Sequence, residues 1–214
     1  MKYQAVIFDL DGVICFTDEY HYLAWKQMAD SRGVYFDREI NNRLRGASRM
    51  ETLEIVRERY EGPALSAERK AELAAMKNDI YRESLAQMSP ADLSDEVRST
   101  LDGLRGMGLK LAIGSSSKNT PFILRQLGLG SYFDAVSDGN HITRSKPDPA
   151  VFLKAAEMLG LAPSVCLVVE DAVSGAQAGH AGGFDVACVG DAAKARAGEY
   201  NMDSIKELLA IAGK

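Results

Sequence analysis

The chain opens with a short apolar segment that breaks off into two carboxylates. Residues 5–8 (AVIF) are all apolar, and Asp9, Asp11 and Gly12 follow them. An apolar run of this length that ends at a glycine predicts a buried β-strand. Both acids then lie at the end of that strand, at the edge of a core. A carboxylate is costly there unless a metal, a cation or hydrogen bonds compensate it. The segment therefore indicates chemistry rather than a purely structural role.

Length, charge and cysteine content exclude several classes of protein. The 214 residues can form one good-sized domain and a smaller one. The net charge of −5 offers no basic footprint for nucleic acid and no polybasic patch for a membrane. Cys15, Cys166 and Cys188 are widely spaced in apolar runs, which predicts buried thiols in a reducing compartment. The amino-terminal residues resemble neither a signal peptide nor a membrane span, so we expect a cytoplasmic protein.

Helical periodicity dominates from about residue 18 to residue 88. Apolar residues recur at helical spacing over 20–28, 53–60 and 73–85. The first stretch stops at a glycine, the second follows a Ser-x-x-Glu capping-box pattern at 48–51, and the third precedes a Ser-Pro pair. These stretches predict an all-helical insert after the first strand.

Helix and strand patterns alternate from about residue 95 onward. Apolar runs predict strands at 109–114, 135–136, 165–169 and 185–189, with helical patterns between them. This alternation predicts an α/β fold, a doubly wound parallel sheet with an inserted helical domain. We expect the core to comprise residues 1–16 and 89–214 and the helical domain residues 17–88, with hinges near 14–17 and 88–94.

Polar side chains gather where the predicted strands end. Sites in open parallel sheets form beyond the carboxyl ends of the strands. The candidates there are Asp9 and Asp11, Ser115 to Ser117, Lys146, and Glu170 with Asp171. Taken singly, each has a structural explanation, as a helix N-cap, a turn residue or a solvated lysine. Taken together, the carboxylates would repel one another, so the site needs a divalent cation and at least one lysine. Hard oxygen ligands of this kind suit magnesium.

The order of these motifs resembles the haloacid dehalogenase (HAD) superfamily of phosphotransferases, which use an aspartate nucleophile. The resemblance is carried by DLDGV (9–13), the serines at 115–117, SKPDP (145–149) and VED (169–171). Nearly the whole chain is similar to one family of that superfamily, the β-phosphoglucomutases. The segments that carry this closer resemblance are EYHYLAWK (19–26), RLRGASR (43–49), KND (77–79), SPADL (89–93), SSSKNTPF (115–122) and SYFDA (131–135). The resemblance implies a Rossmann-like core with a helical cap.

The resemblance implies specific roles for the strand-end residues. Asp9 would be the nucleophile that becomes an aspartyl phosphate, and Asp11 would be the general acid and base. One Mg²⁺ ion would be held by the side chains of Asp9 and Asp171 and by the main-chain carbonyl of Asp11, with Glu170 supporting it. Ser115 and Lys146 would hold the oxygens of the phosphoryl group in transfer.

A mutase must also grip a second phosphate, and the resemblance assigns that task mainly to the helical domain. Arg49 would hold the distal phosphate, because its planar guanidinium suits bidentate recognition. Three residues of the core would assist it, namely Ser116, Lys118 and Asn119. The implied substrate-sensing residues are His21 and Lys77, with Thr17 at the hinge, and the implied substrate-binding residues include Trp25 and Gly46.

Structural alternatives stay open for the residues of the helical domain. Arg49 and Lys77 could both be solvated helix residues. His21 and Trp25 are four residues apart, so both could pack on the core face of one helix. Phe16 stands in the hinge where related sequences commonly carry an aspartate. The polar segment 139–144 places His141 and Arg144 near the lysine motif, where we expect them to be exposed.

The implied activity is the interconversion of β-D-glucose 1-phosphate and glucose 6-phosphate through β-glucose 1,6-bisphosphate, with glucose 1,6-bisphosphate as primer. The expected partner is a small sugar phosphate, with no nucleic acid and no membrane. A monomer is expected, because no long apolar strand edge or heptad run demands assembly. One alternative is a sugar-phosphate phosphatase of the same superfamily. Another is a catalytically silent sensor of a phosphorylated metabolite, against which the intact Asp9 and Asp11 pair argues.

Overall fold

The computed structural model describes residues 2–44, 49–60 and 62–213, which form two compact units. The first unit comprises Met1–Phe16 and Met88–Lys214, and the second comprises Thr17–Gln87. The chain therefore leaves the first unit after one strand, forms the second, and returns to complete the first.

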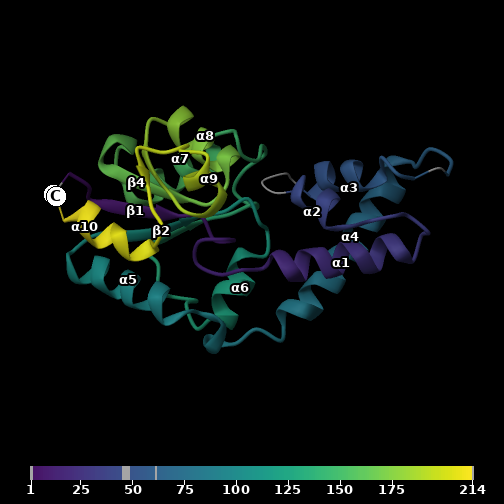
Figure 1. Ribbon diagram of the computed structural model, residues 1–214, viewed down its shortest axis with the longest axis horizontal. Coiled ribbons are helices and arrows are strands. Elements are labelled where there is room, and N and C mark those ends of the chain that lie inside the picture. The colour runs from purple at the N-terminus through teal and green to yellow at the C-terminus, as the bar shows by residue number, and fades with distance from the viewer. Residues whose placement is uncertain (1, 45–48, 61, 214) are drawn as a thin grey trace. The chain divides into compact units, whose positions relative to one another are not determined.

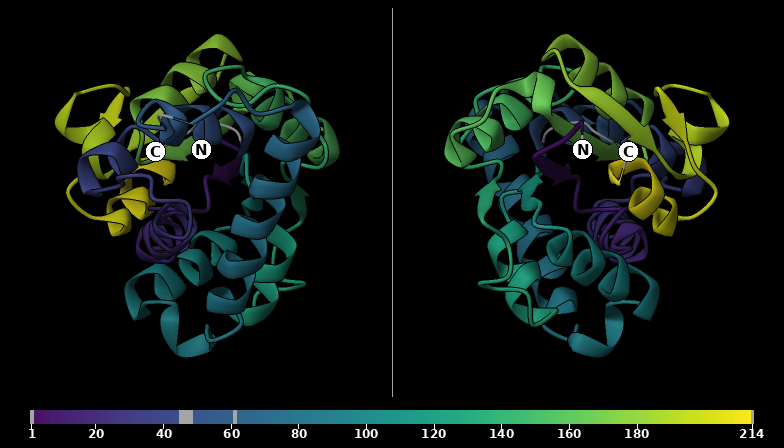
Figure 2. Two further views of the ribbon diagram at one scale, coloured as in Figure 1. Left: turned by 90° about the vertical axis from the view of Figure 1, so that its right-hand side faces the viewer. Right: turned by 90° about the vertical axis from the view of Figure 1, so that its left-hand side faces the viewer.

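The first unit is built on a six-stranded sheet in which all paired strands are parallel. The strands are β1 (Ala5–Phe8), β2 (Lys110–Gly114), β3 (Ala135–Ser137), β4 (Cys166–Glu170), β5 (Asp185–Cys188) and β6 (Tyr200–Asn201). Their order is β3-β2-β1-β4-β5-β6, so β1 and β4 are the two central strands. Ile7 of β1, for example, lies opposite Ala112 of β2 and Val168 of β4. Figure 2 shows the short β6, in yellow, at one edge of the sheet beside β5.

Helices cover both faces of the sheet. The helices of this unit are α5 (Asp95–Gly106), α6 (Thr120–Gln126), α7 (Ala150–Leu159), α8 (Val173–Ala181), α9 (Gly190–Lys194) and α10 (Leu208–Ala212), with 3₁₀ turns at Pro90–Asp92, Pro163–Val165 and Ile205–Glu207. In Figure 1, α5 and α10 lie on one face of the sheet, and α7, α8 and α9 lie on the other. Ala5 and Ile7 pack in one cluster with Phe152 of α7 and Ala176 of α8. Burial on both faces explains why β1 is a continuous apolar run and why β4 is apolar up to its last residue.

The predicted fold class, a doubly wound parallel sheet, is confirmed. The strands β2 to β5 begin and end within one residue of the predicted ranges. Four short elements near the carboxyl end were not predicted, namely α9, β6, the 3₁₀ turn at Ile205–Glu207 and α10.

The second unit is entirely helical within its described residues. Its helices are α1 (Asp18–Asp30), α2 (Arg38–Asn42), α3 (Arg49–Arg57) and α4 (Ala67–Leu85). They enclose their own apolar core, which includes Trp25, Phe36, Leu53 and Leu73. Side chains cap two of the helices, because Asp37 accepts a hydrogen bond from the Ile40 N–H of α2 (2.9 Å), and Ser66 caps α4 in the same way. The expected cap residue Ser48 lies outside the described residues.

The predictions about the cysteines and about membrane spans can be compared with the structure directly. The three cysteines are free and buried, as expected. Among the residues that the structure describes, no helix combines the length and the apolar character that a membrane span requires.

Candidate active site

The centre of the site lies where the two middle strands of the sheet end. Asp9 follows β1, Glu170 is the last residue of β4, and Asp171 comes directly after it. The backbone N–H of Asp9 donates to the Val169 carbonyl (2.9 Å), which continues the pairing of β1 with β4 up to the acids. The strand order changes direction between these two strands, and ligand-binding crevices of doubly wound sheets form at such a switch point. The topology therefore brings together acids that are about 160 residues apart in the sequence.

Lys146 joins two of these acids. Its Nζ donates hydrogen bonds to Asp9 Oδ1 and to Glu170 Oε1, and all three residues are buried. The ammonium also lies over the Phe152 ring, 4.6 Å from its centroid. Burial alone would lower the pKa of Lys146, but the carboxylates of Asp9 and Glu170 outweigh burial and hold that pKa above its ordinary value. Lys146 is therefore a fixed positive charge at the end of β1, where a phosphate group would need one.

Glu170 is held through both of its carboxylate oxygens. While Oε1 accepts from Lys146, Oε2 accepts the backbone N–H groups of Asp171 (3.0 Å) and Ala172 (3.1 Å). The absence of a side chain at Gly175 makes room for this carboxylate, because a Cβ there would lie 2.0 Å from it. Burial raises the pKa of Glu170 to about 7, with Lys146 opposing the rise and Asp9 adding to it. With both oxygens engaged, Glu170 suits a supporting role better than a direct role in the chemistry.

Asp9, Glu170 and Asp171 form a cluster with the geometry of a cation site. Each offers a carboxylate oxygen, and these oxygens lie within 4.8 Å of one another. The loop after β1 folds over Asp171, since a Cβ at Gly12 would lie 2.2 Å from Asp171 Oδ2. Gly12 also has a φ of +87°, so this approach requires glycine on two grounds. Three carboxylates beside one lysine retain negative charge, and oxygen ligands of this kind suit Mg²⁺. The residues present therefore fit a magnesium ion.

Asp11 stands outside this carboxylate cluster, in the loop that follows β1. The structure places it half-buried, and its backbone forms a bridge with Cys15. Its role as an acid and base stays a prediction.

The serine run follows β2, the neighbour of β1, and therefore opens on the same edge of the sheet. Ser115 is buried, its N–H donates to the Ser137 carbonyl (3.1 Å), and its Oγ accepts the Ser117 N–H (3.2 Å). The Ser116 Oγ is buried and has no hydrogen-bond partner among the described residues. Buried polar oxygens normally have a hydrogen-bond partner, so this one stands out. Lys118 is exposed, and Asn119 is buried immediately before α6.

The loop before Lys146 packs against this serine run. A Cβ at Gly139 would lie 2.3 Å from the Ser116 carbonyl oxygen, and the Asn140 side chain donates to the Lys118 carbonyl (3.3 Å). His141 and Arg144 are exposed, as expected, and each lies beside an aspartate, His141 by Asp138 and Arg144 by Asp148.

A second polar cluster lies inside the helical unit. Lys77 of α4 is only 5% exposed, and its Nζ lies 2.8 Å from His21 Nδ1 of α1. The same ammonium lies 4.6 Å from the ring centroid of Tyr81 and 5.1 Å from that of Trp25. His21 stacks on Tyr81 with 4.0 Å between the ring centroids. The burial of Lys77 excludes the alternative of a solvated helical lysine.

Burial lowers the pKa of His21 well below 6.5, and the charges of Lys77 and Arg49 lower it further. A neutral His21 accepts a hydrogen bond from Lys77 at Nδ1 and carries its proton on Nε2. Trp25 is buried in the apolar core of the unit, as the structural alternative predicted, and its ring also faces Lys77.

The remaining predicted residues of the helical unit have simpler surroundings. Arg49 is exposed at the start of α3, and its Nη2 donates to Asn78 Oδ1 (2.7 Å). Thr17 is buried just before α1, and its carbonyl accepts the His21 N–H (3.0 Å). Gly46 lies outside the described residues.

Three residues next to these clusters were not predicted as site residues. They are Phe152 under Lys146, Asn78 beside Arg49, and Tyr81 beside His21 and Lys77. The sequence held a signal for one of them, because Tyr81 follows Lys77 by four residues and so shares its helix face.

Known proteins are similar to this chain in both sequence and structure. A sequence model of the haloacid dehalogenase-like hydrolase family matches residues 3–183. The chain is 41% identical over 189 residues to the β-phosphoglucomutase of Bacillus subtilis (strain 168), which spans 87% of this chain and 83% of that protein. It is 35% identical to the fructose-1-phosphate phosphatase YqaB of Escherichia coli (strain K12), over 86% of this chain and 95% of that protein. The crystal structure of β-phosphoglucomutase from Clostridium difficile superposes with a TM-score of 0.89, at 32% identity, over 96% of this chain and 93% of that one.

Proposed function

This chain belongs to the haloacid dehalogenase-like hydrolase family, and we propose that it is a β-phosphoglucomutase. It would convert β-D-glucose 1-phosphate into glucose 6-phosphate by way of a bound β-glucose 1,6-bisphosphate. Two features support this activity, namely the similarity to β-phosphoglucomutases and the charged cluster of the helical unit.

In the proposed cycle Asp9 is the nucleophile. Its carboxylate, fixed by Lys146, attacks the phosphorus of glucose 1,6-bisphosphate, the primer. An oxygen–phosphorus bond forms on Asp9, and the bond from phosphorus to the sugar oxygen breaks. Lys146 and Ser115 hold the phosphoryl oxygens during the transfer, in which negative charge is spread over those oxygens.

Asp11 moves the proton in both half-reactions. It protonates the sugar oxygen that leaves, and it then takes the proton of the 6-hydroxyl of β-glucose 1-phosphate as that oxygen attacks the phosphoaspartate. The bisphosphate that results turns over, Asp9 accepts its other phosphate, and glucose 6-phosphate departs.

The carboxylate cluster is the evidence for a magnesium site in this part of the molecule. Asp9, Asp171 and the main-chain carbonyl of Asp11 would hold it, and Glu170 would support it. When bound, Mg²⁺ neutralises part of the negative charge of the phosphoryl group.

The observation that carries the choice of a mutase is the cluster of His21, Lys77 and Arg49 in the helical unit. A hydrolase acts on one phosphate and needs no second cationic grip. A mutase must keep a sugar with two phosphates while it reorients, and Arg49 would hold the distal phosphate with Ser116, Lys118 and Asn119. The neutral His21, with its proton on Nε2, would donate to Asp11 or to the sugar. The Ser116 Oγ, which has no hydrogen-bond partner in the described part of the chain, supports a role in ligand binding.

A phosphorus NMR time course tests the proposal. The purified protein is given β-glucose 1-phosphate, Mg²⁺ and a trace of glucose 1,6-bisphosphate. We expect the glucose 6-phosphate signal to grow faster than that of inorganic phosphate. If inorganic phosphate is the dominant product, the protein is a phosphatase.

The second candidate is a sugar-phosphate phosphatase of the same family. The 35% identity to a fructose-1-phosphate phosphatase, over nearly all of that protein, favours it. The same time course, run with fructose 1-phosphate, measures this activity directly.

A further inference from the structure

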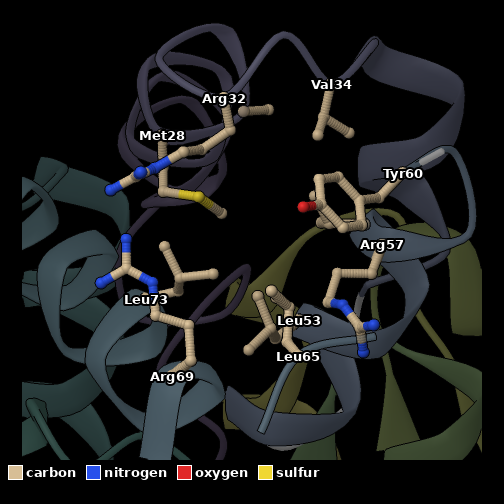
Figure 3. A pocket seen from close by; sticks show the side chains of 11 residues that line it. Met28, Arg32, Val34, Leu53, Arg57, Tyr60, Leu65, Arg69 and Leu73 are labelled. Carbon is tan, nitrogen blue, oxygen red and sulfur yellow. The ribbon is translucent and has the colours of Figure 1, made fainter. Parts of the chain in front are cut away.

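The helical unit contains a pocket that takes no part in the proposed reaction. Its volume is about 150 Å³, and apolar side chains of α1, α3 and α4 form most of its wall. The apolar wall residues are Met28, Ala29, Val34, Leu53, Val56, Leu65 and Leu73. Figure 3 shows Met28, Leu73 and Leu53 around the opening, with the Tyr60 hydroxyl turned toward its interior. An apolar cavity of roughly this size accommodates a benzene ring.

Arginine side chains surround this apolar wall. Arg32, Arg57 and Arg69 all line the pocket. In Figure 3 the guanidinium groups of Arg32 and Arg69 lie on the Met28 side, whereas that of Arg57 lies on the opposite side. Arg69 is paired with Glu72 (2.5 Å), but Arg32 has no ion-pair partner among the residues that the structure describes.

Among the residues that the structure describes, the ion pairs around the pocket leave a positive charge. Glu54 pairs with both Arg57 (2.7 Å) and Lys70 (2.9 Å), so one carboxylate serves two cations there. Arg32 adds a further charge at the mouth. This excess stands in a protein whose net charge is −5, so it is a local feature and not a consequence of composition.

One donor of an arginine that lines the pocket, Arg57, is left unsatisfied. Its Nε is buried and has no hydrogen-bond partner among the described residues, although its Nη1 donates to Glu54. A buried donor without an acceptor destabilises the folded state.

We propose that this pocket is a binding site for a small organic acid that has one ring-sized apolar body and a single carboxylate. The apolar body fills the space between Met28, Leu53 and Leu73, and the carboxylate lies at the mouth beside Arg32. A guanidinium presents a planar pair of donors that matches a carboxylate. On the Met28 side, Arg32 is the guanidinium without an ion-pair partner among the described residues, so a ligand with one negative charge would match it.

Methyl NMR of the full chain tests the proposal with three probes. Benzoate has both the ring and the charge, benzyl alcohol has the ring alone, and acetate has the charge alone. We expect benzoate to shift the methyl signals of Leu53, Val56 and Leu73 with saturation, and benzyl alcohol to do so more weakly. Acetate should leave these signals unchanged. These methyl groups also distinguish the pocket from an anion site in the sheet unit, whose signals would shift instead.

Substitutions then test the contribution of the Arg32 charge and that of the pocket's shape separately. Arg32→Gln should weaken benzoate binding by up to about fivefold, the effect of a partly exposed ion pair, and leave benzyl alcohol unchanged. Leu65→Trp, at a partly buried position on the wall, should fill the space and weaken both ligands. Arg82→Gln is the matched control, because Arg82 is exposed on α4 and lies outside the pocket.

Three results would overturn the proposal. They are the absence of saturable shifts with benzoate, equal affinities for benzoate and benzyl alcohol, and a loss of benzoate binding in Arg82→Gln as large as that in Arg32→Gln. The first two results use only the unmodified protein, so they test the proposal even if a variant fails to fold.

Discussion

The neutral, partly buried His21 makes the stability of the helical unit depend on pH in a direction that the structure fixes. The folded state holds the pKa of His21 well below 6.5, chiefly through burial and then through the charges of Lys77 and Arg49. Protonation would also remove the acceptor at Nδ1 that Lys77 uses at 2.8 Å. The unfolded chain therefore binds this proton first as the pH falls. Stability is full above about pH 6.5 and decreases below it, down to the pKa of the folded state.

The magnitude follows from the reference value. At pH 5.5 an unfolded histidine with a pKa of about 6.5 is mostly protonated, while His21 in the folded state is not. The free energy of unfolding should therefore be about 1.4 kcal/mol lower at pH 5.5 than at pH 7.5 on account of this one group. His21→Gln removes the titration, so the variant should lack this part of the pH dependence.

Trp25 provides the assay. It is the only tryptophan of the chain, it is buried in the core of the helical unit, and its ring lies 5.1 Å from the Lys77 ammonium. Urea unfolding followed by Trp25 fluorescence thus reports on this unit. The measurement compares the unmodified protein, His21→Gln and, as a control, His180→Gln, which changes a more exposed histidine of the sheet unit. Parallel pH profiles for the unmodified protein and His21→Gln would refute the assignment of His21 as a histidine that stays neutral in the folded state.

Three further outcomes are expected. Asp9→Asn should abolish the phosphoenzyme, detected by mass spectrometry or by trapping with fluoroberyllate, and retained turnover would reject Asp9 as the nucleophile. Arg49→Ala should reduce isomerisation more than it reduces hydrolysis of a small aryl phosphate. Asn78→Ala removes the hydrogen-bond partner of Arg49, so it should have the same effect to a smaller degree. Equal losses in both assays would count against the role of Arg49 in holding the distal phosphate. Lys146→Met leaves two buried carboxylates without their cation, so unfolding followed by circular dichroism should show a loss of about 3–5 kcal/mol, and a loss below about 1 kcal/mol would contradict the bridge.

The sheet could be predicted from the sequence because its strands are buried on both faces. A strand such as β4 is then apolar up to Val169, and the acids Glu170 and Asp171 mark its end. The edge strand β6 was not predicted because it is not buried on both faces. Tyr200 and Asn201 are only two residues, partly or fully exposed, and carry no apolar run. Short helices such as α9 have too few turns to show a period.

The convergence of the strand-end acids was predictable, but their partners were not. Parallel topology alone puts Asp9 and Asp171 at one edge of the sheet. The two hydrogen bonds of Lys146 depend on the path of a loop, and no periodicity describes that path. The pairing of Lys77 with His21 joins residues 56 positions apart on two helices, so it depends on how α1 packs against α4.

The division of chemistry between the two units explains why the strand-end residues alone do not decide the product. The proposed nucleophile Asp9, Lys146 and the proposed cation site at the edge of the sheet would serve hydrolysis as well as transfer to a sugar, because both reactions begin with the same attack on phosphorus. The family model that covers residues 3–183 describes hydrolases, and similar proteins include both a mutase and a phosphatase. The outcome then depends on which acceptor meets the phosphoaspartate, water or a sugar hydroxyl. The residues proposed to choose it, His21, Lys77 and Arg49, belong to a unit with its own apolar core. Acceptor choice can therefore change through substitutions that leave the phosphoryl-transfer site intact.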